Sequence, residues 1–209
     1  LTLGGSDIRL ALPYLMQRRI LTATLLPSDL SPDFPYLIAP AEVHPFFNVT
    51  GVDWLARNRP EARRVALCSQ TDLLGLPSLA TYRAAFDVAA RDVVKEVLYD
   101  VGGADPAAIV AEMMSVSPDV LCWCSSNPQM IEEMTVAAFE AGFAGEILAC
   151  TCDNYQQLIA RTSPEFMERF TFQFPDFDDP ELADTGFFFH RPKAFYDRYT
   201  ERFPGHWTA

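Results

Sequence analysis

Short apolar segments alternate with segments of helical periodicity through the middle of the chain, and this alternation constrains the fold more than any other feature. Residues 65–68, 93–99, 119–123 and 147–150 are apolar, β-branched runs typical of strands buried on both faces. Apolar residues recur at helical spacing between them, namely Leu79, Tyr82, Phe86 and Ala90, then Ile109, Val110, Met113 and Met114, and then Met130, Met134, Ala137 and Ala141. This order predicts an α/β fold with a parallel sheet, right-handed crossovers and helices on both faces.

Two of the predicted helices have strong start signals. Asp105-Pro106 and Asn127-Pro128 each place a capping side chain before a proline at the first helical position, where the missing N–H costs nothing. Both helices therefore begin where a strand ends. Small ligands bind parallel sheets at the carboxyl ends of the strands, close to helix N-termini, so we expect the binding site at this edge.

The front of the chain predicts two strands and a helix ahead of an α/β unit of about residues 42–170. Residues 1–6 predict a strand and a glycine-rich turn, residues 7–18 a helix, and residues 20–25 the second strand. Residues 27–45 are rich in Pro, Ser and Asp, which is typical of a crossover.

The back of the chain predicts one more strand and one more helix. Residues 170–177 form an aromatic run of strand type that leads into Asp178-Asp179-Pro180. A helical pattern follows at about residues 188–202.

The chain of 209 residues has a formal charge of -12. Nucleic acids and anionic membranes are bound by clustered Lys and Arg, so this charge argues against both as partners. No apolar run reaches the roughly 20 residues that cross a bilayer, and no basic segment precedes an apolar one as in a signal peptide. The first residue is Leu1 rather than Met, as in a processed or incomplete chain. We expect a small ligand that is neutral, zwitterionic or held by local dipoles.

Two C-x-C pairs, Cys122-Trp123-Cys124 and Cys150-Thr151-Cys152, raise the question of a metal site. Zinc sites built from four cysteines use pairs on loops that turn both sulfurs inward. On a strand a C-x-C pair points both sulfurs to one face, and two neighbouring strands could bring four sulfurs together. A sheet covered on both faces leaves no room for an ion, however, and free cysteines are among the most buried residues. We therefore expect buried structural thiols and no metal.

Catalytic motifs are not found in the sequence. His44, His190 and His206 lie far apart and lack metal-ligand spacing. No G-x-S-x-G, Walker or dinucleotide-binding fingerprint is present. An α/β enzyme of the flavodoxin type needs such a nucleophile or phosphate-binding loop, so we expect neither an enzyme nor a cofactor.

A series of short motifs runs along almost the whole chain. The motifs are Gly4-Gly5-Ser6, Arg19-Ile20-Leu21, Leu26-Pro27-Ser28, Arg63-Arg64-Val65-Ala66-Leu67, Asp72-Leu73-Leu74-Gly75, Ala108-Ile109-Val110, Ser117-Pro118-Asp119-Val120-Leu121 and a segment from Ala137 to Gly142. Their order and spacing resemble the type 1 periplasmic solute-binding proteins of ABC transporters, and among them the leucine/isoleucine/valine-binding proteins.

The resemblance implies two α/β lobes joined by three crossovers, with a ligand enclosed between them by hinge closure. Residues 42–171 would form the complete second lobe, residues 1–41 part of the first, and residues 172–209 the return crossover and another part of the first. The chain would then be incomplete at both ends, because the family's opening strands and closing helices are missing.

The implied function is that of the substrate-binding protein of an ABC importer. Its partners would be a membrane permease and a small carboxylate, such as a hydrophobic or branched-chain amino acid or a related acid. The implied location is the periplasm or another extracytoplasmic space. A ligand-binding sensor or regulator of the same fold is the alternative.

In this family the first lobe holds the ligand carboxylate. Gly5 and Ser6 match a turn whose backbone N–H groups and hydroxyl do so, and the alternative is a tight turn with an N-cap. Ser28 matches a second such position, with Leu26 beside it, and the alternative for Ser28 is a loop cap.

The ligand residues implied for the second lobe follow its strands. Leu74 falls where many relatives place an aromatic residue, so the pocket wall would be aliphatic or wider. Ser126 and Asn127 occupy another such position, although helix capping alone accounts for Asn127. Thr151 lies where branched-chain amino-acid binders commonly supply a carboxylate for the ligand ammonium. Asp153 would either replace that carboxylate or cap a helix, which leaves open a ligand without an amine.

Overall fold

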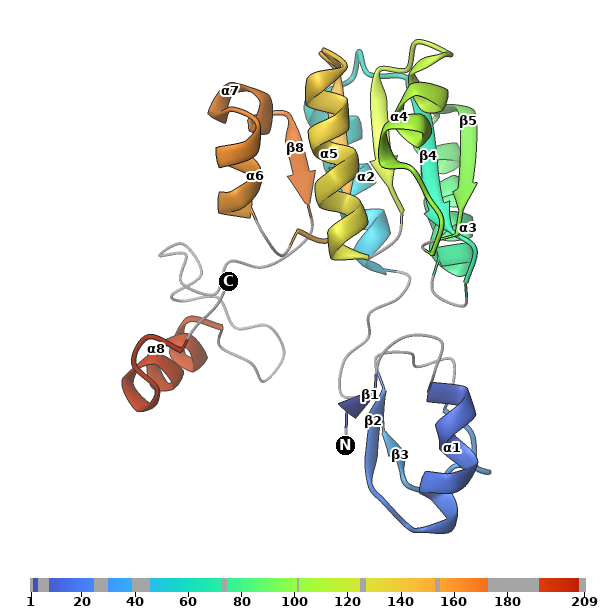
Figure 1. Ribbon diagram of the computed structural model, residues 1–209, viewed down its shortest axis with the longest axis vertical. Coiled ribbons are helices and arrows are strands. Elements are labelled where there is room, and N and C mark those ends of the chain that lie inside the picture. The colour runs from blue at the N-terminus through green and yellow to red at the C-terminus, as the bar shows by residue number, and fades with distance from the viewer. Residues whose placement is uncertain are drawn as a thin grey trace. The chain divides into compact units, whose positions relative to one another are not determined.

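The computed structural model describes residues 2–3, 8–24, 30–38, 46–72, 75–100, 102–124, 127–152, 155–172 and 192–206 (Figure 1). It divides into two compact units, Leu1–Gln173 and Phe174–Ala209. Among the described residues, no helix combines the length and the hydrophobicity that crossing a membrane requires.

A five-stranded parallel sheet forms the centre of the first unit. Its strands are β4 (Arg64–Gln70), β5 (Asp92–Tyr99), β6 (Val120–Trp123), β7 (Glu146–Ala149) and β8 (Phe170–Phe172). They pair in the order β5-β4-β6-β7-β8, and every pairing is parallel. The predicted parallel sheet is therefore confirmed, because none of the four strands expected between residues 65 and 150 pairs antiparallel.

Helices cover both faces of this sheet (Figure 1). They are α2 (Phe46–Asn58), α3 (Gly75–Val88), α4 (Pro106–Met114), α5 (Pro128–Glu140), α6 (Tyr155–Arg161) and α7 (Pro164–Met167). Helix α2 packs on α3, and α4 packs on α5. Neighbouring residues of β4 reach opposite layers, since the Cys68 Sγ lies 3.5 Å from the Met134 Sδ of α5 and the Ser69 hydroxyl donates to the Gly75 carbonyl of α3.

The core fills both spaces between the sheet and its helices. The strand segments 65–70 and 120–123 are fully buried, as expected for strands covered on both faces. The same expectation was wrong for residues 93–99, because β5 is an edge strand in which Val97 and Tyr99 are buried and Glu96 and Leu98 are exposed. The largest side chain among them is Trp123, which has no exposed surface and donates its indole N–H to Thr135 of α5. Tyr82 and Phe86 of α3 are equally buried, with ring centroids 6.3 Å apart.

Gly145 allows the chain to enter β7 close to the preceding strand. A Cβ at Gly145 would lie 2.2 Å from the carbonyl oxygen of Asp119, and the next residue, Glu146, donates its N–H to that same oxygen. Only a residue without a side chain fits this contact.

We expect Gly145→Ala to lower the free energy of unfolding by roughly 1 to 3 kcal/mol, the usual cost of overpacking. The matched control is Gly103→Ala, because nothing lies within 4 Å of a Cβ at Gly103. Urea denaturation followed by circular dichroism measures both. Equal midpoints for the two variants would contradict the contact at Asp119.

A smaller parallel sheet lies at the front of the chain. It contains β1 (Thr2–Leu3), β2 (Thr22–Thr24) and β3 (Leu37–Ile38), in that order, and α1 (Ile8–Gln17) connects its first two strands. The first two strands and the helix agree with the prediction. Strand β3 was missed, since it lies inside the segment 27–45 that we expected to be a crossover.

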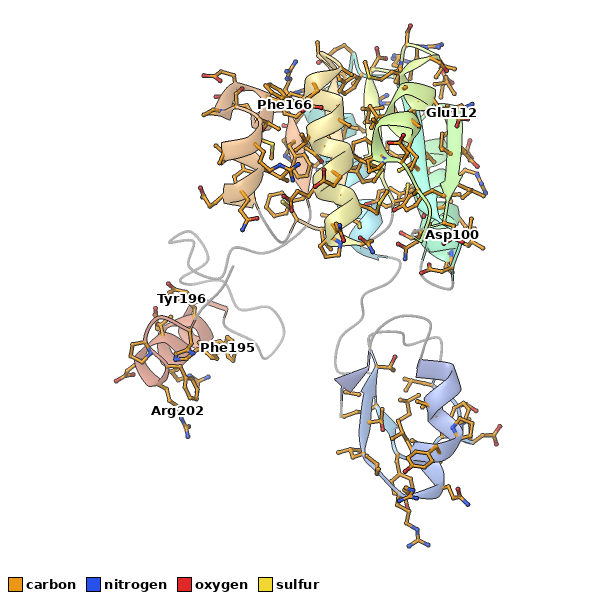
Figure 2. All side chains as sticks on the ribbon, viewed as in Figure 1. Asp100, Glu112, Phe166, Phe195, Tyr196 and Arg202 are labelled. Carbon is orange, nitrogen blue, oxygen red and sulfur yellow. The ribbon has the colours of Figure 1, made fainter. Side chains whose placement is uncertain are left out.

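In the second unit the structure describes helix α8 (Pro192–Arg202), within the predicted range of about 188–202, and the residues that follow it to 206. Phe195 and Tyr199 of this helix and Phe203 just after it contact one another in series, with successive ring centroids 6.2 and 5.2 Å apart. Phe195 is labelled in Figure 2. The predicted strand at 170–177 is found as β8 over its first three residues, and residues 173–177 lie outside the described part. The division of the chain at residues 41 and 171 stays a prediction.

Candidate functional site

The carboxyl edge of the five-stranded sheet collects polar residues from successive strands. Gln70 ends β4, Asn127 follows β6, and Thr151 follows β7. Asp100, which follows β5 at the same edge, is labelled in Figure 2. Two long helices, α3 and α5, also begin here. The structure thus gives one edge both the helix N-termini and the side chains that could orient a small ligand.

The corner between β4 and α3 is tightly built. The N–H of Gly75, the first residue of α3, donates to Asp72 Oδ1 at 2.7 Å, and the Gln70 amide NH₂ donates to Asp72 Oδ2 at 2.7 Å. A Cβ at Gly75 would lie 2.1 Å from the Gln70 carbonyl oxygen, so this close approach needs a glycine. The Gln70 side chain is therefore held between a carboxylate and the start of a helix.

The side-chain oxygen of Gln70, at the other end of the amide, is buried and has no hydrogen-bond partner among the described residues. Gln70 as a whole is 5% exposed. Sequence reasoning missed this residue. The available signal was a glutamine that closes an otherwise apolar run of strand type, just before Thr71 and Asp72.

Asn127 caps helix α5. Its side-chain oxygen accepts a hydrogen bond from the Met130 N–H at 3.0 Å, and its backbone is extended, as an N-cap requires. Asp105 caps α4 in the same way by accepting from Ala107. The capping role weighed for Asn127 is thus confirmed, and a ligand role stays a prediction.

Loss of the Asn127 cap should cost about 1 kcal/mol of stability, because the Met130 N–H loses its partner. We expect this loss for Asn127→Ala, whereas Asn127→Asp should retain most of the stability because its carboxylate also accepts. Chemical denaturation of both variants measures the difference. A ligand contact would show separately, as a change in affinity out of proportion to this loss.

Four thiols are buried around the ends of β4, β6 and β7. Cys68, Cys122, Cys124 and Cys150 are buried, and Cys152 is partly exposed. The sulfurs of Cys122 and Cys124 lie 3.8 Å apart on one face of the strand, as the C-x-C spacing predicts. The expected burial is therefore confirmed for both residues of the first pair and for the first residue of the second pair.

Burial dominates the chemistry of these thiols. It raises the pKa of the Cys150 thiol to about 12, and the electrostatic effect of the nearby Cys124 raises this pKa further. It also raises the pKa of Cys68, Cys122 and Cys124. The protonated form is favoured in each case, whereas zinc needs thiolates. No group of three or more metal-ligating side chains is found in the part of the chain that the structure describes.

The remaining predicted ligand residues fall into two groups. Thr151 is partly buried and lies two residues after the end of β7, the neighbour of the strand β6 that leads to Asn127. Both residues therefore lie at the carboxyl edge. The others lie outside the described residues, namely Gly5, Ser6, Leu26, Ser28, Leu74, Ser126 and Asp153.

Two surface hollows are found among the described residues. One of about 490 Å³ is at the amino edge of the sheet and includes Ala62, Met114 and Phe143. Another of about 330 Å³ lies beside β5 and α4, where Figure 2 labels Asp100 and Glu112. The carboxylate of Glu112 pairs with Lys95 at 2.7 Å. Neither hollow includes Gln70, Asn127 or Thr151.

Solved structures of binding proteins share this fold. A leucine-binding protein from Thermotoga maritima is 20% identical, with a TM-score of 0.70, over 96% of this chain and 56% of that one. A fatty-acid ABC transporter substrate-binding protein from Thermomonospora curvata is 17% identical, with a TM-score of 0.70, over 98% of this chain and 51% of that one. A solute-binding protein from R. palustris in complex with 4-hydroxybenzoate is 14% identical, with a TM-score of 0.60, over 71% of this chain and 42% of that one.

This chain therefore spans about half the length of these proteins. At such identities the likeness shows the fold, which confirms the predicted fold class. No match is found among curated protein sequences.

A family model described as periplasmic binding protein matches residues 2–209. Members of this family are ligand-binding, non-enzymatic components of transport systems and act in the periplasm or outside the cell. The match covers nearly the whole chain and agrees with the parallel sheets described above. The chain belongs to the periplasmic binding protein family.

Proposed function

We propose that this chain is the substrate-binding component of an ABC importer and binds a small carboxylate in a cleft between two lobes. The observation that carries this proposal is the carboxyl edge of the five-stranded sheet. Two helix N-termini and the polar residues Gln70, Asn127 and Thr151 meet there. The carboxyl edge of a parallel sheet with convergent polar groups is the usual place for a small ligand, and this edge would form the wall of the cleft that the second lobe supplies.

The names of similar solved structures support a carboxylate. They include binding proteins for leucine and for fatty acids, and structures with bound valine, 4-hydroxybenzoate or 3,4-dihydroxybenzoic acid. These compounds differ in size and in the presence of an amine, but each has a carboxyl group. A carboxylate is therefore the part of the ligand that we assign first.

Residue roles follow from the sequence motifs. Gly5, Ser6 and Ser28 would hold the carboxylate, and Leu26 would line the cleft beside them. On the second lobe, residues 42–171, the walls would come from Leu74 and Ser126.

Thr151 and Asp153 would face the ligand from the second lobe. An amine on the ligand would pair with Asp153, and a ligand without an amine would leave that carboxylate to cap the following helix. Calorimetry of leucine and of its analogue without the amine separates the two cases.

The mechanism would be closure of the lobes about their crossovers. Closure traps the ligand, excludes water from it and presents the closed form to a membrane permease. The chain would act outside the cytoplasm and would not change its ligand chemically. Residues 1–41 and 172–209 would belong to the first lobe.

Binding of carboxylates in preference to their neutral amides tests the proposed function. Isothermal calorimetry of the chain against leucine, 4-hydroxybenzoate and a medium-chain fatty acid, each paired with its amide, should show at least one acid that binds. Its amide should bind more weakly by roughly tenfold or more, because it loses the charge-assisted hydrogen bonds. Equal binding of each acid and its amide would rule out the carboxylate assignment.

A further inference from the structure

The Gln70 amide has two ends in different situations. Its NH₂ donates to Asp72 Oδ2 at 2.7 Å, and the other oxygen of Asp72 accepts from the Gly75 N–H at 2.7 Å. A carboxylate can only accept, so the NH₂ must face Asp72 and the amide oxygen must face the other way. That oxygen is buried without a hydrogen-bond partner among the described residues.

An unpartnered buried acceptor is unusual in a folded protein. Most buried polar atoms have a partner, and an exception calls for an explanation such as a functional role or a bound water. An apolar residue of similar shape in place of Gln70 would remove the free-energy cost of burying an unpaired oxygen. The glutamine instead stands at the end of β4, at the same edge as the starts of α3 and α5. Its position makes a ligand the natural source of the missing donor.

The donor that fits this oxygen is uncharged. Gln70 is 5% exposed, and a cation that enters such a site loses its hydration while a neutral amide oxygen compensates only part of that cost. The neighbouring Asp72 carboxylate already accepts from Gly75 and Gln70. A hydroxyl or neutral N–H needs no such compensation, and its hydrogen bond satisfies the amide oxygen.

We propose that Gln70 is a specificity-determining residue that accepts a hydrogen bond from an uncharged hydroxyl or N–H of the ligand, at the end remote from its carboxylate. Asp72 is the positioning residue, because its carboxylate fixes which end of the amide faces the ligand. Gly75 permits the arrangement by letting α3 begin against Gln70. This inference rests on the proposed function and names the kind of carboxylate that the site prefers.

Two pairs of ligands that differ in one hydroxyl test the inference. The pairs are tyrosine with phenylalanine, and 4-hydroxybenzoate with 4-methylbenzoate. In at least one pair, the wild-type chain should bind the hydroxyl compound roughly tenfold more tightly, because the hydroxyl satisfies a buried acceptor. Gln70→Met keeps the length of the side chain and removes the acceptor, so it should bind both members of that pair about equally.

A second variant keeps the glutamine and reverses its amide. Asp72→Asn can still accept from the Gly75 N–H, but its new NH₂ would face Gln70. The Gln70 amide should then turn its oxygen toward the side chain at position 72 and offer its N–H groups to the ligand. The preference for the hydroxyl compound should disappear, although Gln70 itself is unchanged. Thermal denaturation of both variants checks that the fold is retained.

The outcomes separate this inference from the proposed function. If the wild type binds carboxylates but shows no hydroxyl preference, or if either variant keeps that preference, the role of Gln70 is wrong and the function stands. A bound water that always satisfies the amide oxygen would give this result. If the wild type binds none of the acids in either pair or in the earlier calorimetry, the proposed function fails together with the inference. A hydroxyl preference that both variants abolish supports the proposal.

Discussion

The free energy of unfolding should fall steeply above pH 9, because the folded chain keeps buried thiols protonated. Burial raises the pKa of Cys150 from 9.0 to about 12, and it raises the pKa of Cys68 and Cys124 well above 9.0. An unfolded chain releases these protons near pH 9 and the folded chain does not. The stabilising effect is therefore complete below pH 9 and is lost as the pH rises through this window.

The expected effect is large. One pKa unit corresponds to about 1.4 kcal/mol, so Cys150 alone would remove about 4 kcal/mol of stability by pH 12. At pH 10.5 Cys150 alone would already remove about 2 kcal/mol, against a total of roughly 5 to 15 kcal/mol for a typical domain. The raised pKa values of Cys68 and Cys124 add to this loss in the same direction. Tyr82, whose pKa is raised by burial and by the nearby Cys122, adds to the loss above pH 10.

Urea denaturation at pH 7, 9 and 10.5 measures this loss. Cys150→Ala removes one titrating group and should reduce the dependence on pH. Val120→Ala is the matched control, because it removes buried apolar volume and should lower stability by a similar amount at every pH. A wild-type free energy of unfolding that is the same at pH 7 and 10.5 would show that the thiols ionise freely in the folded chain.

The α/β unit of the chain was predictable from its sequence because its pattern is regular. The central strands β4, β6 and β7 contain short apolar runs, and Asp105 and Asn127 mark two helix starts through caps that the structure contains. The burial of Cys122 and Cys124 followed from the same reasoning, since a C-x-C pair on a covered strand has both sulfurs on one face.

Strand β3 was missed because its evidence is not local. Leu37–Ile38 is a strand of two residues inside a segment rich in proline, and only its pairing with β2 makes it a strand. A short apolar pair has no periodicity to count. Its assignment therefore needs the tertiary structure.

The candidate site was predictable as an edge of the sheet but not as a set of contacts. The prediction that ligands bind at the carboxyl ends follows from strand order alone. Gln70 could not be recognised in this way, because its interest depends on where Asp72 directs its amide and on what surrounds the opposite oxygen. Such facts depend on side-chain geometry, which the spacing of residues does not encode.

Leucine should bind more tightly than 4-methylpentanoate, its analogue without the amine, if Asp153 pairs with the ligand ammonium. Asp153 is the acidic residue that the resemblance of the sequence motifs puts nearest to this role, since Thr151 would occupy the position of the usual carboxylate. The loss expected on removing the amine is roughly 1.5 to 3 kcal/mol, the usual range for a hydrogen bond to a charged group. Calorimetry of the two compounds measures it.

Asp153→Asn supplies the matched variant for this experiment, because it keeps the shape of the side chain and removes the charge. It should weaken the binding of leucine and leave that of 4-methylpentanoate nearly unchanged, so that the two compounds bind alike. If the wild type already binds them equally, or binds neither, the amino-acid form of the proposal is wrong. Equal binding would leave Asp153 as a helix cap and would assign the site to a carboxylate without an amine, for which Gln70 could still select a hydroxyl at the other end.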